Sequence, residues 1–130
     1  MTTCNPANPI TLQAAASLVN YQYTFIMCDS AGKAALPTGT TVQCIGILQN
    51  APASGEEAHI LLVGSGGTSK VLLGATLDEG ARVTHEYVSG TDCGKAKAAG
   101  SGLYPLGTLL QGGAEDELGE VILNSTTKDA

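Results

Sequence analysis

The sequence predicts an all-β fold: a small curled sheet of the β-tulip or β-barrel kind, with an extended N-terminal arm. Turn-forming segments recur about every 8–12 residues, the spacing typical of sandwiches and barrels. The chain contains 17 glycines, which favour many tight turns. No segment shows the 3.6-residue apolar period of a long helix. We expect one domain over residues 13–124, between an arm over 1–12 and a polar tail over 125–130.

The first residues, MTTCNPANP, contain two prolines and no apolar period, which predicts an extended arm. The following QAAAS segment at 13–17 has the composition of a helical turn. Residues 18–27 are rich in β-branched and aromatic side chains and predict a strand. Its buried face would carry Leu18, Tyr21, Tyr23, Phe25 and Met27.

Shorter extended runs then alternate with turns to the end of the domain. The first turn, Asp29–Lys33, has an Asp that can bond its own backbone and a Gly that can adopt positive φ. Within 81–88, alternation places Val83 and Tyr87 opposite Thr84 and Glu86. Strands are expected at 33–36, 42–48, 58–63, 69–73, 81–88, 95–99, 103–110 and 120–124.

One segment occurs in two similar versions. Residues 45–62 read IGILQNAPASGEEAHILL, and residues 106–123 read LGTLLQGGAEDELGEVIL. At a single offset, the pattern aligns Gly46 with Gly107, Leu48 with Leu109, Glu56 with Glu117, and Ile60 with Val121. Either the domain contains an internal duplication, or two β-hairpins with Gly-rich turns merely look alike.

Composition excludes several classes of function. The net charge is −6, and the six basic residues are scattered, so neither a phosphate-binding footprint nor a polybasic membrane patch is expected. The apolar runs are too short to span a bilayer, and the first nine residues lack a signal-peptide core. The four cysteines form no CxxC pair or zinc spacing. We interpret them as reduced thiols in a protein made in a cytosol.

Two motifs resemble catalytic or phosphate-binding loops but lack the required spacing. The turn at Asp29–Gly32 has one residue more than the Asp-Ser/Thr-Gly turn of aspartic proteases. The loop at Gly90–Lys95 has three residues between its glycines where a phosphate loop has four, and Ala96 replaces the hydroxyl residue. We interpret both as ordinary turns.

Other titratable residues also have simple structural interpretations. The histidines, His59 and His85, could join a metal site with Glu56, Glu57 or Glu86, or pair with Cys44 or Cys93 as a nucleophile; His85 looks exposed. We instead expect the cysteines to act as small buried apolar residues. The acidic clusters at 56–57 and 115–117 should be solvated loop tips, and they could meet a partner's polar groups. No catalytic residue, cofactor or metal ligand is therefore predicted.

Several segments in order resemble the small capsid cement, or head decoration, proteins of tailed bacteriophages. The resemblance covers roughly Thr11 to Leu123. The segments are LVNYQYTF at 18–25, DSAGK at 29–33, IGILQNAPASGE at 45–56, GTSKVLLG at 67–74, LDEGARV at 77–83, GKAKAA at 94–99, LG at 106–107 and GEVI at 119–122.

The resemblance implies a non-enzymatic structural protein of the virion, assembled in the host cytoplasm. Such a protein binds the outer surface of an expanded head, commonly as a homotrimer, and bridges neighbouring major capsid proteins. Its N-terminal arm would join the capsid by strand addition. The implied capsid-contact residues are Asn5, Pro6, Asn8, Pro9, Ile10 and Leu12.

Two other functions remain as alternatives. A small-ligand or carbohydrate-binding β-barrel module on a virion surface would use aromatic platforms, for which the chain offers Tyr21, Tyr23, Tyr87 and Tyr104. An enzyme would need a cysteine or carboxylate centre built from the groups above. Neither alternative has a specific sequence motif.

Overall fold

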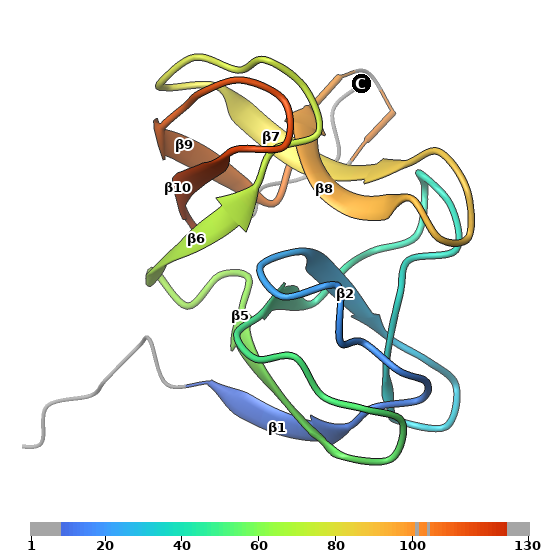
Figure 1. Cartoon of the computed structure of the whole chain (residues 1–130). Helices are drawn as coiled ribbons and strands as arrows, with labels where there is room; N and C mark the ends of the chain where they lie inside the picture. Colours follow the sequence, from blue (N-terminus) through green and yellow to red (C-terminus); the bar gives the residue numbers. More distant parts are fainter. Residues whose placement is uncertain (1–8, 101, 104, 125–130) are drawn as a thin grey trace, which may run out of the picture.

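The computed structural model describes residues 9–100, 102–103 and 105–124, and within them the fold is all-β, as predicted. Two five-stranded sheets form two lobes, one below the other in Figure 1. The first sheet contains β1 (Ile10–Gln13), β2 (Phe25–Cys28), β3 (Ala34–Ala35), β4 (Gly46–Leu48) and β5 (Glu57–Leu62). The second contains β6 (Thr68–Leu72), β7 (Arg82–Tyr87), β8 (Cys93–Ala98), β9 (Gly107–Gln111) and β10 (Leu118–Ile122).

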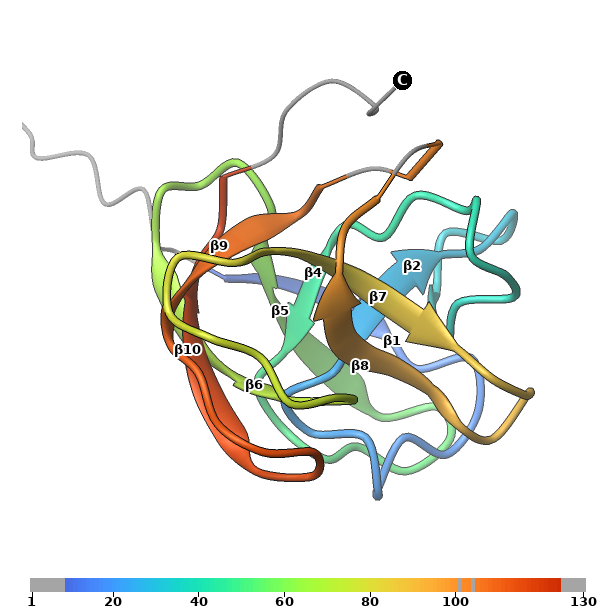
Figure 2. The ribbon, with the colours of Figure 1, turned by 90° about the horizontal axis from the view of Figure 1, so that it is seen from above.

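Both sheets have the same topology. The first has the strand order β1-β5-β4-β2-β3, and the second has the order β6-β10-β9-β7-β8, which is the same order shifted by five strands. Each sheet curls until its outer strands meet at one parallel bridge, Ala14 with Ala34 in the first and Leu73 with Ala96 in the second. Figure 2 shows the curl of the second sheet from above. Short strands, bulges and turn glycines allow this curvature. We call residues 9–63 the first copy and the rest of the described chain the second.

Detailed contacts repeat at the offset found in the sequence. Glu56 Oε1 accepts a hydrogen bond from the Ala53 N–H at 2.7 Å, and Glu117 Oε1 accepts one from the Ala114 N–H at 2.7 Å. Each acidic loop is therefore closed by its own carboxylate. The residues before these glutamates, Gly55 and Asp116, both have positive φ. These matches support duplication over a chance likeness of two hairpins.

The paired glycines, Gly46 and Gly107, also have the same surroundings. A Cβ on Gly46 would collide with the carbonyl oxygen of Leu61 and lie 2.7 Å from Ile60 Cγ2. A Cβ on Gly107 would lie 2.5 Å from the carbonyl oxygen of Ile122 and 2.7 Å from Val121 Cγ2. At both positions the neighbouring strand approaches too closely for any side chain.

The aliphatic core is divided between the two lobes but continuous where they meet. The first copy encloses a cluster containing Leu18, Ile26, Leu48 and Ile60. Alternate residues of the same strands point the other way, because side chains alternate across a strand. Those residues join the larger cluster of the second copy, which is formed by Phe25, Cys44, Ile47, Leu61, Val71, Leu73, Val83, Ala96, Leu106, Leu109, Val121 and Leu123. The two copies therefore pack as one body.

Each strand from β2 to β10 overlaps a predicted strand, whereas three local predictions are wrong. The helical turn at 13–17 does not form, because the chain continues from β1 to the bridge at Ala14. Of the strand predicted over 18–27, only the last part forms, as β2, because Tyr23 adopts a φ of 67° in a turn. In β7, Val83, Thr84 and His85 are all buried, so the predicted alternation fails and His85 is not exposed.

Candidate functional site

The predicted capsid-contact residues lie at the start of the chain. Asn5, Pro6 and Asn8 are outside the described residues, and Pro9 is exposed. Ile10 and Leu12 belong to β1, where they pair with Ile60 and Ala58 of β5. Both side chains are half-buried against the core of the first copy. In Figure 1 the chain enters the lower lobe through this strand.

Strand β1 is an outer strand of the first sheet. It pairs with β5 on one side, and in the described chain it reaches β3 only at the Ala14–Ala34 bridge. The preceding residues Ile10–Gln13 therefore lack a second partner strand among the described residues. An outer strand of this kind can accept an added strand from another chain.

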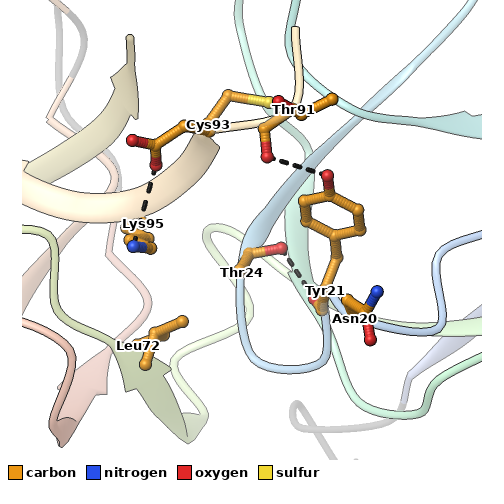
Figure 3. Close-up of a pocket in the computed structure, with 8 residues that line it drawn as sticks. Asn20, Tyr21, Thr24, Leu72, Thr91, Cys93 and Lys95 are labelled. Carbon is orange, nitrogen blue, oxygen red and sulfur yellow. Dashed lines mark hydrogen bonds and ion pairs between the residues drawn. The ribbon is translucent and has the colours of Figure 1, made fainter. Parts of the chain in front are cut away.

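A second candidate site is a cleft of about 380 Å³ between the two copies, shown in Figure 3. The first copy contributes residues of the loop before β2, and the second contributes the end of β6, the loop before β8, and β8 itself. The lining residues are Asn20, Tyr21, Thr24, Leu72, Thr91, Asp92, Cys93 and Lys95.

Hydrogen bonds hold the walls of this cleft in place. The Tyr21 hydroxyl donates to the Thr91 carbonyl oxygen at 2.8 Å, which joins segments 70 residues apart in sequence. The Thr24 hydroxyl donates back to the Tyr21 carbonyl at 2.7 Å and fixes the turn. Next to these bonds, β8 lies directly against β2, because a Cβ on Gly94 would lie 2.9 Å from the Phe25 carbonyl oxygen. The cleft is thus built into the packing of the two copies.

Lys95 is the charged centre of the cleft wall. Its Nζ lies 2.8 Å from Asp116 Oδ1 and 3.7 Å from Asp92 Oδ1. The hydrogen bond to Asp116, followed by the nearby carboxylates, raises the pKa of Lys95 and keeps it cationic. Burial raises the pKa of Glu86, and the charges of Asp92 and Glu115 raise it further. The positive charges of Lys95 and Lys97 act on the pKa of Glu86 in the opposite direction.

Among the described residues, the hydrogen bonds of the candidate histidines and of Cys93 go to groups other than one another. Cys44 and Cys93 are buried, as predicted, and burial is the main cause that raises the pKa of each thiol. His85 is also buried, and its Nε2–H donates to the Gly39 carbonyl oxygen at 2.7 Å. His59 lies on the first copy, where its ring nitrogen is 3.1 Å from the Thr11 hydroxyl. These imidazoles do not line the cleft that contains Cys93.

The motif-like turns have the structural roles expected of them. Asp29 Oδ1 accepts hydrogen bonds from the N–H groups of Ala31 and Lys33, so its carboxylate is used within the turn. In the loop at 89–94, Ser89 Oγ accepts from the N–H groups of Thr91 and Asp92. Among the described residues, no three His, Cys, Asp or Glu side chains group as metal ligands would. No helix in the described chain is long and apolar enough to cross a membrane.

Comparison with known proteins yields a structural likeness without a sequence match. No family model and no curated protein matches the chain. Among solved structures, the chain is similar to the head fiber gp8.5 N base of bacteriophage phi29, with a TM-score of 0.65 and 12% sequence identity. The likeness covers 92% of this chain and 97% of that chain. The chain therefore shares its fold with a phage head protein, the class that the sequence resembles.

Sequence reasoning missed the cleft because its walls come from distant segments. The sequence places Tyr21 on the face of a strand, and it indicates an ordinary polar turn at Gly90–Lys95. The local signal that the two segments share is a polar, turn-rich composition over residues 19–24 and 89–95. Nothing in either segment indicates that the two lie together.

Proposed function

We propose that this chain is a structural decoration protein of a bacteriophage head. It binds the outer surface of the expanded shell, bridges neighbouring major capsid proteins and stabilises the head mechanically. The observation that carries the proposal is the fold shared, over nearly the whole of both chains, with a base domain of a phage head fiber. The resemblance of the sequence to capsid cement proteins supports it independently.

The features of the described chain fit a binding role without catalysis. The cleft contains no imidazole, and its thiol has a raised pKa, so the groups needed for nucleophilic attack are not assembled there. The outer strand β1 offers backbone groups for strand addition at the end of the chain where the contact arm is expected. An acidic protein also stays dispersed until the shell offers its site.

We also propose that the protein occupies the capsid as a homotrimer. A trimer on a symmetric lattice position makes three equivalent contacts, and their combined affinity exceeds that of one contact by avidity. Counting bound chains per capsid would test this, because saturation should occur at a multiple of three chains per occupied position.

Co-sedimentation with capsids that lack the protein tests the binding. Expanded and unexpanded capsids should be mixed with increasing protein and pelleted. We expect saturable pelleting with expanded capsids and a higher capsid disruption temperature when the protein is bound. Absence of pelleting with either form would contradict the proposal. Pelleting with no change in disruption temperature would remove the stabilising role alone.

A further inference from the structure

The margin of the cleft carries exposed apolar side chains. The large apolar residues most exposed in the described chain are Val19, Val88, Leu110 and Leu118, and three of them adjoin the cleft lining. Val19 precedes Asn20, the Val88 N–H donates to the Asp92 carbonyl at 2.9 Å, and Leu118 pairs in register with Leu72. A polar cleft bordered by exposed apolar groups is typical of a protein-binding surface.

The duplication provides an internal control for the apolar wall. The cross-strand pair Leu72–Leu118 of the second copy corresponds to the pair Gln13–Glu57 of the first. Both positions point outward, and the first copy folds with polar residues there. The fold therefore does not require leucines at this place. In the second copy Leu72 lines the cleft, and Leu118 is its exposed cross-strand neighbour.

The charge around the cleft complements a cation. Lys95 interacts electrostatically with Asp92, Asp116 and Glu86. Glu86 also interacts electrostatically with Glu115 and Lys97. Asp92 and Lys95 line the cleft, and Asp116 adjoins it through its hydrogen bond to Lys95. The whole cluster of four carboxylates and two ammonium groups has an excess of negative charge. Asp92 and Asp116 keep part of their side chains exposed, with relative areas of 47% and 64%, so an incoming group can reach them.

We propose that this cleft is the docking site for a basic, extended segment of the protein partner. A lysine or arginine side chain enters beside Asp92 and Asp116, and its apolar neighbours in the segment pack on Leu72, Leu118 and Val88. The volume, about 380 Å³, is at the lower end of the range for ligand pockets and suits one long side chain. The identity of the partner as the capsid protein rests on the proposed function.

The test uses charge-neutral variants that keep the fold. The cleft variant combines Asp92→Asn with Asp116→Asn. Both substitutions are nearly isosteric, and Asn tolerates the positive φ at Asp116. The matched control is Asp78→Asn with Glu120→Gln, which removes two exposed charges outside the cleft lining. On expanded capsids, the cleft variant should bind about tenfold more weakly at low salt, as loss of two ion pairs predicts. The control should bind like the wild type.

A probe without capsids separates this inference from the proposed function. Acetyl-arginine amide, titrated into ¹⁵N-labelled protein, should shift the amide resonances of Tyr21, Asp92 and Lys95, and these shifts should vanish in the cleft variant. If the cleft variant bound capsids as tightly as the wild type does, the inference would be overturned and the proposed function would stand. If the arginine probe shifted these resonances but the wild type bound no capsids, the proposed function would be overturned and the cleft's affinity for a basic group would stand. Shifts caused by neutral glycans and not by the arginine probe would overturn it in favour of a sugar site.

Discussion

Replacing Gly46 or Gly107 by alanine tests the duplicated architecture, because the two positions should respond alike. Each glycine lies in a strand that is paired with an antiparallel neighbour, and an added Cβ meets the backbone carbonyl oxygen of that neighbour. At Gly107 that contact would be 2.5 Å, well inside normal packing distance. A backbone carbonyl cannot rotate away as a flexible side chain can. The strands must therefore separate, which weakens the sheet and the core behind it.

The expected loss of stability is large for a single methyl group. Adding a methylene to a packed core typically costs about 1–3 kcal/mol, and a backbone collision belongs at the upper end. A loss of about 3 kcal/mol should lower the Tm of a domain of this size by roughly 10 °C. Circular dichroism melts and urea titrations of both variants would measure it. The losses of stability in Gly46→Ala and Gly107→Ala should agree within about 1 kcal/mol.

Gly90→Ala is the matched control, because no atom lies within 4 Å of a Cβ placed there. Its stability should stay within about 0.5 kcal/mol of the wild type. If Gly46→Ala or Gly107→Ala melted like this control, the close approach of the strands would be refuted. If only one of them were destabilised, the two copies would not be structurally equivalent.

Three further predictions concern the buried thiols, the acidic loops and the buried histidine. In native protein, iodoacetamide should modify the exposed Cys28 before Cys44, whose burial raises its pKa; equal rates in peptide mass spectrometry would contradict this. Removing either loop carboxylate by Glu56→Ala or Glu117→Ala should cost about 1 kcal/mol in urea unfolding, since each removes the hydrogen bond that closes its loop; a neutral result at both would refute the closure of these loops. Burial lowers the pKa of His85 from 6.5, so the unfolded chain binds a proton that the folded chain does not, and stability should fall as the pH drops below about 6.5 toward the lowered pKa. His85→Gln should flatten that decline, and an unchanged slope would exclude this histidine as its source; the raised pKa of Glu86 acts in the opposite sense nearer its ordinary value of 4.5.

The sequence was sufficient for the fold class because turn spacing and apolar runs are local signals. It did not reveal β1, a four-residue strand that follows a proline-containing segment and is stabilised by β5, almost 50 residues away in the chain. The sequence also predicts a strand that runs through Tyr23 into β2. In the structure Tyr23 has positive φ, and its N–H donates a tertiary hydrogen bond to the Leu48 carbonyl. Tertiary contacts override local propensity at both places.

The duplication was only partly visible in the sequence for a related reason. Gly46 and Gly107 are retained because their surroundings exclude a side chain, so the hairpins around them align. Elsewhere the copies need only the same backbone path: Gly80 occupies the turn that corresponds to Tyr23, with φ 83 against 67. The cleft depends on Tyr21 meeting Thr91 across the two copies, and no periodic pattern encodes that contact.

The most direct test of the proposed function is a cryo-electron microscopy difference map between expanded capsids assembled with and without this protein. The account predicts additional density on the outer surface, contacting at least two neighbouring major capsid proteins and accommodating the two-lobed fold. Identical maps at saturating protein, or additional density confined to the inner surface, would contradict it.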